Sequence, residues 1–231
     1  MLDAARGSEE EVVMSRTDAE ILWEVARGLA RTDAEVSREA GAGPTLPPLL
    51  FFTDPARTPR PWETAARLPP GSGVVFRHFG AADASATARR LREVTAAAGV
   101  RLLIGLDVAL AAEVGADGVH LPERALGQVE ALTASHPGWL VTGAVHGTEG
   151  IARGGDLHAL VLSPVFPAGG ASAARPALGP AGFRALASSA KQPVYALGGI
   201  TAENAPALIG SGACGLAGVE AIRSAFGPPR S

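Results

Sequence analysis

Short apolar runs alternate with helical stretches along the chain from residue 47 onward. The runs are apolar at successive positions rather than at every second one, which is typical of strands in a parallel sheet that is buried on both faces. Eight such runs are present: LLFF (49–52), VVF (74–76), LLI (102–104), GVHL (118–121), WLVTG (139–143), ALVLS (159–163), PVYAL (193–197) and CGLAG (214–218).

Helix-forming segments rich in Ala, Arg and Leu lie between these runs, and several open on an N-cap residue and close on glycine. They include ATARRLREVTAAAG, ALGQVEALTASH, PAGFRALASSA and TAENAPALIGSG. Eight strand–helix repeats predict an α/β fold, a single (β/α)8 TIM barrel over residues 46–231, compact beside the ~250 residues typical of that fold. A doubly wound open sheet is the alternative, because periodicity does not reveal closure.

Residues 1–45 predict a helical extension in front of the barrel. Thr17 is a candidate N-cap, and an apolar stripe at helical spacing follows it, formed by Ile21, Leu22, Val25 and Leu29. We expect this extra N-terminal helix to be interrupted near Gly28. Its stripe either packs under the barrel or mediates a dimer contact, and packing is the simpler arrangement.

Composition narrows the range of partners. The formal charge of -3 and the pI near 6.0 offer no basic surface for nucleic acid or for an anionic membrane. The single Cys214 excludes an internal disulfide and a cysteine-rich zinc site. No apolar run reaches the ~18 residues of a membrane span. We therefore expect a soluble cytoplasmic protein with a small-molecule ligand, and the sequence leaves open whether it forms a homo-oligomer.

Polar side chains gather at the predicted carboxyl ends of the strands, where barrels of this kind carry their active sites. Arg77 and His78 follow the second run, His120 lies in the fourth, His146 follows the fifth and Ser163 ends the sixth. A single histidine at a strand end is more often structural than catalytic. Three of the five histidines at one mouth favour a site.

Two glycine turns follow the last two strands. Gly198 and Gly199 open the sequence GGIT, and Gly218 and Val219 end the sequence GLAGV. Backbone N–H groups at these positions commonly bind phosphate in such barrels, so we predict a phosphate site there. The alternative is two helix-entry turns that only need a positive φ. Glu220 argues against a snug phosphate site unless its carboxylate points away.

Seven motifs occur in a characteristic order and spacing: FFTD (51–54), VVFRHF (74–79), GADGVHLPE (115–123), VTGAVHG (141–147), LVLSPVFPAGG (160–170), PVYALGGIT (193–201) and GACGLAGVEAI (212–222). Together they resemble the thiamine phosphate synthase and TenI family over roughly residues 47–226. The resemblance implies thiamine biosynthesis and a thiazole or thiamine phosphate ligand. It also implies one of two chemistries. Synthases join a pyrimidine diphosphate to a thiazole phosphate with Mg²⁺, whereas TenI-like members move a proton on a thiazole carboxylate phosphate without metal.

The synthase pattern is incomplete in this chain. The resemblance leads one to expect an Asn-Asp pair after the third strand, and Gly105 and Leu106 stand there instead. A second expected carboxylate falls on Ala125. The basic residue expected two positions beyond Arg77 is Phe79. A departing pyrophosphate would therefore find few cations.

Asp107 and Glu123 are the carboxylates nearest to the positions where the resemblance implies Mg²⁺ ligands. Mg²⁺ demands near-octahedral oxygen geometry, which two displaced carboxylates do not provide by accident. Arg175 is the one charged residue in the loop AGGASAARP after the sixth strand. We expect no metal site and no cofactor, with Mg²⁺ needed only if the chain is a synthase.

The TenI-like pattern is better kept. In that subfamily a histidine after the fifth strand is implicated in proton transfer, and His146 matches it within GAVHG. Imidazole is a base near neutral pH without special tuning. Arg77 is a candidate partner of the substrate carboxylate, with His78, His120 and Ser163 as candidate further contacts. A structural role within its strand is an equal alternative for His120. The prediction is a metal-independent thiazole phosphate tautomerase in which His146 transfers the proton.

Other functions compete with this one. A thiamine phosphate synthase with displaced Mg²⁺ ligands stays open, as does a non-catalytic homologue that binds thiazole or thiamine phosphate or has a regulatory role. A Schiff-base aldolase is excluded, because the one lysine, Lys191, precedes the seventh strand and so lies at the opposite end of the barrel.

Overall fold

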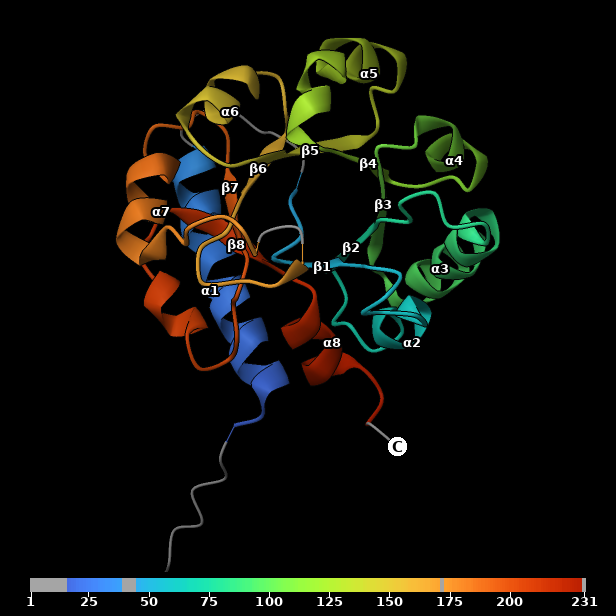
Figure 1. Ribbon diagram of the computed structural model, residues 1–231, viewed down its shortest axis with the longest axis horizontal. Coiled ribbons are helices and arrows are strands. Elements are labelled where there is room, and N and C mark those ends of the chain that lie inside the picture. Colours follow the sequence, from blue (N-terminus) through green and yellow to red (C-terminus); the bar gives the residue numbers. More distant parts are fainter. Residues whose placement is uncertain (1–15, 39–44, 171–172, 230–231) are drawn as a thin grey trace, which may run out of the picture.

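Eight parallel strands form the centre of the molecule (Figure 1). The structure, a computed structural model, describes residues 16–38, 45–170 and 173–229. The strands are β1 (Leu49–Phe52), β2 (Gly73–Phe76), β3 (Arg101–Gly105), β4 (Gly118–Leu121), β5 (Leu140–Val145), β6 (Ala159–Leu162), β7 (Val194–Leu197) and β8 (Ala213–Gly218). Leu50 of β1 lies beside Gly73 of β2 and beside Ala217 of β8, so the sheet closes on itself. The predicted (β/α)8 barrel is confirmed, and the open doubly wound sheet is excluded.

Helices surround the barrel; α1 precedes the first strand and the others follow strands. They are α1 (Asp18–Arg38), α2 (Pro61–Ala65), α3 (Ala84–Ala98), α4 (Val108–Glu113), η1 (Glu123–Gln128), α5 (Val129–Ser135), α6 (Thr148–Arg153), α7 (Gly179–Ala187), η3 (Ala205–Leu208) and α8 (Glu220–Phe226). None of the helices in the described ranges combines the length and the hydropathy of a membrane-spanning segment.

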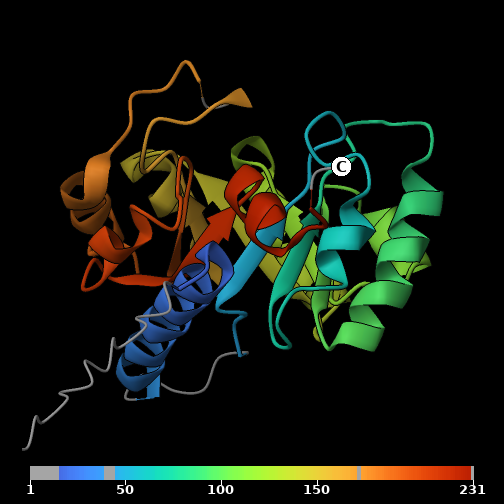
Figure 2. The ribbon, with the colours of Figure 1, turned by 90° about the horizontal axis from the view of Figure 1, so that it is seen from below.

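The helix α1 lies against the side of the barrel. It starts with a capping box, in which the Glu20 N–H donates to Thr17 Oγ1 (3.3 Å) and the Thr17 N–H donates to Glu20 Oε2 (2.8 Å). The helix continues through Gly28, so the expected interruption there is wrong. Its buried residues, among them Leu22 and Leu29, belong to the layer outside the sheet, and the helix packs on β8 (Figure 2). The apolar stripe therefore covers the outer face of β8 rather than the floor of the barrel.

The connection after β7 contains only the short 3-10 helix η3, so the α-helix expected over TAENAPALIGSG is wrong. Pro206 has no N–H to donate and breaks the helical ladder. Thr201 and Asn204 form the same reciprocal pairing that starts α1, the N–H of Thr201 donating to the Asn204 side chain (2.9 Å), but no α-helix follows it here. α1 contacts η3 and covers the adjacent strand β8.

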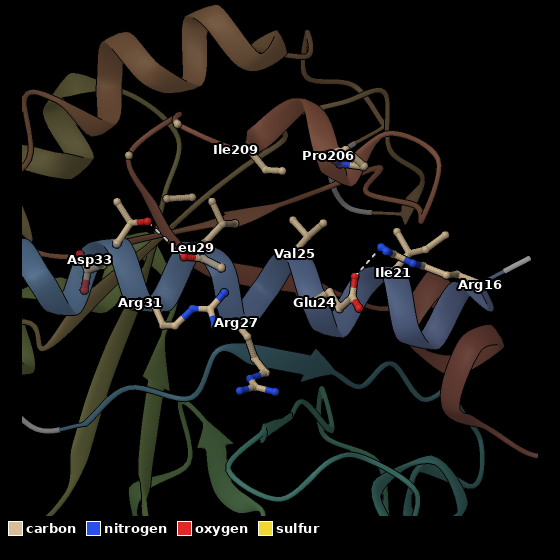
Figure 3. A pocket seen from close by; sticks show the side chains of 15 residues that line it. Arg16, Ile21, Glu24, Val25, Arg27, Leu29, Arg31, Asp33, Pro206 and Ile209 are labelled. Atoms are coloured by element: carbon tan, nitrogen blue, oxygen red, sulfur yellow. Dashed lines mark hydrogen bonds and ion pairs between the residues drawn. The ribbon is translucent and has the colours of Figure 1, made fainter.

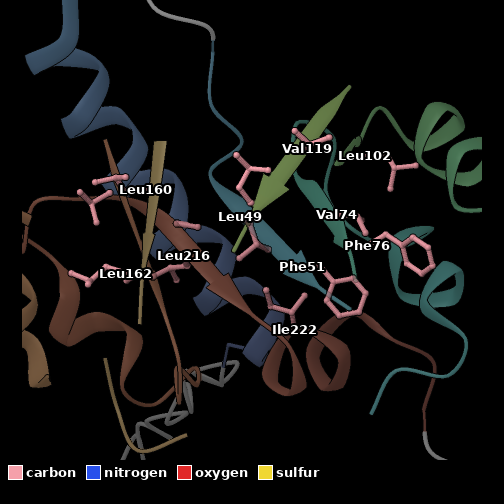
Figure 4. Close-up of a cluster of buried hydrophobic side chains, with 14 of the residues drawn as sticks. Leu49, Phe51, Val74, Phe76, Leu102, Val119, Leu160, Leu162, Leu216 and Ile222 are labelled. Carbon is pink, nitrogen blue, oxygen red and sulfur yellow. The ribbon is translucent and has the colours of Figure 1, made fainter. Parts of the chain in front are cut away.

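Apolar side chains form two layers, because successive residues of a strand point to opposite faces of the sheet. The outer layer lies between strands and helices and includes Phe51, Val74 and Leu216 (Figure 4). The inner layer fills the barrel and consists of Leu50, Phe52, Val75, Leu103, Leu140, Ala159, Val161, Tyr195, Cys214 and Ala217. The Tyr195 hydroxyl donates to the carbonyl oxygen of Pro47 (2.6 Å), which satisfies the polar group of this largest interior side chain.

Candidate active site

The carboxyl ends of all eight strands meet at one mouth of the barrel, because the strands are parallel and the sheet is closed. Arg77 follows β2, His146 follows β5 and Ser163 follows β6, while His120 lies within β4. The sequence-predicted polar residues therefore belong to strand ends around a single opening.

Arg77 is held inside this mouth. Its Nε donates to the Thr53 carbonyl oxygen (2.8 Å), and its backbone N–H donates to Thr53 Oγ1 (2.9 Å). The guanidinium carbon lies 5.2 Å from the ring centre of Phe52 and 5.4 Å from that of Phe79. Burial lowers the pKa of Arg77 to about 10, against the opposing effect of the Asp54 carboxylate, so the side chain is charged at neutral pH. Its Nη2 is enclosed without a hydrogen-bond partner, and a buried donor of this kind costs free energy.

His120 lies deeper in the barrel. The ring is buried, its Nδ1 lies 3.0 Å from Thr142 Oγ1, and it meets the ring of Phe52 edge-on at 4.9 Å between centres. Burial, aided by the positive charge of Arg77, lowers the pKa of His120 to about 3. The imidazole is therefore neutral at physiological pH and acts as a polar hydrogen-bonding group rather than as a cation.

His78 connects two loops at the mouth. Its Nδ1 accepts the Gly80 N–H (3.1 Å), so the proton of the neutral ring is on Nε2, which lies 3.3 Å from Asp107 Oδ2. The other oxygen of Asp107 accepts the Leu110 N–H at the start of α4 (2.9 Å). Both ring nitrogens of His78 have protein partners in this arrangement, which ties the loop after β2 to the loop after β3.

His146 has a fixed orientation and tautomer. Its Nδ1 lies 2.8 Å from the carbonyl oxygen of Ser163, and 3.3 Å from the Oγ of the same residue. A carbonyl oxygen only accepts, so Nδ1 carries the proton and donates it to Ser163. The second ring nitrogen, Nε2, is then left with a lone pair and is the basic atom of the neutral imidazole. Ser163 thus orients His146.

A pocket of about 540 Å³ lies beside this imidazole. Its lining comes from the β4, β5 and β6 loops and from α6: Pro122, Glu123, Arg124, Ala144, His146, Arg153 and Arg175. The carboxylate of Glu123 bonds through Oε1 to Nη2 of Arg153 (2.7 Å), and its Oε2 is enclosed without a hydrogen-bond partner. The glycine turns after β7 and β8 are not part of this lining.

The glycine turn after β7 packs against the loop that follows β6. Gly198 has φ 103° and Gly199 has φ 64°, both in the region that favours glycine. A Cβ on Gly198 would lie 2.8 Å from the Cα of Pro164, and one on Gly199 would lie 2.8 Å from the carbonyl carbon of Phe166. Close approach to a neighbouring loop therefore requires glycine at both positions, whatever else their N–H groups bind.

The turn after β8 is less crowded. A Cβ on Gly218 would lie 3.3 Å from the side chain of Ile222, a contact that small shifts would relieve. Val219 is the N-cap of the short helix α8, with φ -113°. Glu220, the first residue of that helix, is exposed.

The carboxylates at the mouth fit a Mg²⁺ ion poorly. Both oxygens of Asp107 already accept from protein groups, and one oxygen of Glu123 is bound by Arg153. Within the described ranges, no group of three or more His, Cys, Asp and Glu side chains is arranged to hold a metal ion. An octahedral ion needs more oxygen ligands than this set offers.

Sequence reasoning missed several residues that shape the mouth. Thr53 and Thr142 position Arg77 and His120 from the strand next to each, and Arg153 holds Glu123 from the end of α6. The strand alternation that puts Thr142 on the inner face is visible in the sequence. The pairing of Arg153 with a residue 30 positions away leaves no local signal.

Several known proteins resemble this chain in sequence or in structure. Residues 66–222 match the family model described as thiamine monophosphate synthase. The chain is 36% identical over 144 residues to the thiamine-phosphate synthase of Methanoculleus marisnigri, covering 61% of this chain and 67% of that protein. It is 39% identical over 145 residues to the putative thiamine-phosphate synthase of Geobacter sulfurreducens, covering 58% and 64%. The chain thus spans about two thirds of the length of these relatives. The solved thiamine phosphate pyrophosphorylase from Pyrococcus furiosus aligns with a TM-score of 0.63 at 25% identity, covering 77% of this chain and 91% of that one.

Proposed function

Because this chain belongs to the thiamine monophosphate synthase family, we propose that it serves thiamine biosynthesis as a metal-independent tautomerase of a thiazole carboxylate phosphate. The geometry of His146 carries this proposal. Its Nδ1–H is fixed on the Ser163 carbonyl oxygen at 2.8 Å, its Nε2 holds the lone pair, and the residue lines a pocket. A tautomerase needs a base held in one orientation beside its substrate.

In the proposed reaction Nε2 of His146 removes a proton from one atom of the substrate and returns a proton to another. While the imidazole carries both protons, the Ser163 carbonyl oxygen keeps its hydrogen bond to Nδ1 and stabilises the cation. The net change is a shift of one proton and of the double bonds in the substrate. The reaction consumes no cofactor.

We assign the substrate's charged groups to two regions of the mouth. Arg77 pairs with the carboxylate, since its guanidinium is charged and its Nη2 lacks a partner. The backbone N–H groups of Gly198, Gly199, Gly218 and Val219 hold the phosphate at the ends of β7 and β8. His120, neutral and buried below Arg77, is a further polar contact, and His78 acts through the loop that it ties to Asp107.

A second candidate is a thiamine phosphate synthase, which is what the names of the related proteins favour. That reaction needs Mg²⁺ and cations for the departing pyrophosphate. Both oxygens of Asp107 already accept from protein groups, and the apolar side chains of Phe79 and Leu106 lie at the mouth. These features favour the tautomerase over the synthase.

A panel of thiazole and pyrimidine phosphates, tested for binding and turnover with and without Mg²⁺, discriminates these candidates. The tautomerase predicts turnover of a thiazole carboxylate phosphate in the presence of a chelator. Mg²⁺-dependent formation of thiamine phosphate would establish the synthase. Binding of thiazole phosphates without any turnover would establish a binding protein.

A further inference from the structure

Large apolar side chains are exposed at three positions in the described part of the chain: Phe79 (69%), Leu106 (38%) and Ile209 (65%). The first two lie in consecutive loops at the mouth of the barrel, after β2 and β3. Ile209 lies elsewhere, in a groove between α1 and η3 (Figure 3). Two exposed apolar residues beside a candidate active site mark a surface that a ligand can cover.

The backbone at both mouth residues is unusual. Phe79 has φ 49° and Leu106 has φ 65°, and these are the two non-glycine residues with positive φ in the described ranges. The left-handed conformation is unfavourable for such side chains, and strain of this kind persists where the surrounding structure imposes it, often at functional sites.

Neighbouring contacts fix the two loops relative to each other. His78, next to Phe79, pairs with Asp107, next to Leu106, at 3.3 Å. The Leu106 N–H donates to the His120 carbonyl oxygen (2.9 Å), which anchors that loop to β4. The loop backbones at Phe79 and Leu106 are therefore held by the contact between His78 and Asp107 and by a hydrogen bond to a strand.

The positive charge of Arg77 lies close to the Phe79 side chain. The Arg77 guanidinium is 5.4 Å from the ring centre of Phe79, and its enclosed Nη2 lacks an acceptor. One face of the Phe79 ring thus lies toward a cation, while most of the side chain is open to solvent. A ligand that fits both features has a flat apolar ring with an anionic group attached to it.

We infer that Phe79 and Leu106 form an apolar rim that selects a planar aromatic ring bearing a carboxylate, the ring packing on the rim and the carboxylate reaching Arg77. The inference rests on the proposed function and specifies how that site recognises the ring of its substrate. Offset stacking on Phe79 favours a flat ring over a puckered one. The same rim disfavours a pyrophosphate, whose charges would meet apolar side chains where a cation is needed.

Calorimetric binding of thiazole-5-carboxylate tests the rim, with thiazolidine-4-carboxylate as the puckered comparison and unsubstituted thiazole as the ring without the acid. Phe79→Ala is expected to weaken thiazole-5-carboxylate about tenfold and the puckered acid at most about threefold. Leu106→Ala is expected to weaken the flat acid about threefold. Ile209→Ala, which removes the third exposed apolar side chain, is the matched control and leaves all three affinities unchanged.

Phe79→Lys tests whether a cation at this position shifts the preference of the site from the flat acid to pyrophosphate. It is expected to weaken thiazole-5-carboxylate and to strengthen binding of inorganic pyrophosphate about fivefold or more, because a cation then stands at the rim. Phe79→Tyr keeps an aromatic ring and should retain binding of the flat acid within about twofold.

The inference is overturned if Phe79→Ala binds the flat and puckered acids as the wild type does, or loses both equally. These binding results are independent of turnover. Flat-ring selectivity that depends on Phe79, in a protein without tautomerase activity, would remove the proposed function and keep the rim. Tautomerase activity that Phe79→Ala leaves unchanged would keep the proposed function and remove the rim.

Discussion

At the scale of single residues, burial determines the protonation state of His120. The folded protein lowers the pKa of His120 to about 3, whereas an unfolded chain leaves it near 6.5. Below pH 6.5 the unfolded chain takes up a proton that the folded chain refuses. The contribution of His120 to the free energy of unfolding is therefore complete above pH 6.5. It is lost as the pH falls toward the folded pKa, by at most about 1.4 kcal/mol per pH unit.

His120→Asn should remove this dependence while keeping a polar partner for Thr142. Urea unfolding of the wild type and the variant between pH 7.5 and pH 4 measures the effect. We expect the two stabilities to converge as the pH falls, since only the wild type carries the buried imidazole. Parallel stability curves for the two proteins would show that His120 titrates normally in the fold.

Phe79 has a strained backbone, and relieving this strain should raise the stability of the protein. Phe79→Gly relieves a left-handed conformation, so thermal unfolding should show a gain of about 0.5–1 kcal/mol, the relief being partly offset by the greater freedom of glycine in the unfolded chain. The same variant should bind thiazole-5-carboxylate more weakly. A variant that loses stability would show that the side chain of Phe79 contributes more to folding than its backbone conformation costs.

At the scale of elements, the turn after β7 and the loop after β6 are packed together through Gly199. Gly199→Ala combines an unfavourable positive φ with a clash against Phe166. Gly210→Ala has a similar φ of +72° without a close contact, since its nearest neighbour is 4.0 Å away. We expect Gly210→Ala to cost about 1 kcal/mol and Gly199→Ala about 2–4 kcal/mol.

Chemical denaturation of the two glycine variants isolates the packing contribution, because both share the strain. Equal losses would mean that the β6 loop yields to the added methyl group. In that case the glycine at 199 would be explained by its conformation and by ligand binding alone.

The strands could be predicted from sequence because buried parallel strands are continuous apolar runs, as in LLFF and GVHL. Their ends differ from the observed ones by no more than two residues. The prediction of a helix after β7 was wrong because Pro206 removes a donor of the helical ladder in spite of the apolar spacing. Local sequence patterns thus predict the strands well and the short connecting helices poorly.

The candidate site was only partly predictable for a related reason. His146 and Arg77 stand in local motifs, so their strand-end positions followed from the pattern. The roles of Ser163 in orienting His146 and of Asp107 in holding His78 depend on contacts between neighbouring strands 17 and 29 positions apart in the chain. The exposure of Phe79 is likewise a property of the folded loop and is invisible to hydropathy.

At the scale of the whole molecule, closure of the barrel brings His146 after β5, Arg77 after β2 and the glycine turns after β7 and β8 to one mouth. The central claim is that His146 transfers a proton within this mouth. His136 is a suitable control, because it lies before β5, at the opposite end of the same strand, stacked on Trp139.

Deuterium incorporation into a thiazole carboxylate phosphate in D2O, followed by NMR in the presence of EDTA, tests this claim most directly. We predict exchange by the wild type and by His136→Ala, and a rate at least about 100-fold lower for His146→Ala with ligand affinity kept within a few fold. Exchange by His146→Ala at the wild-type rate, or no exchange by the wild type, would contradict it.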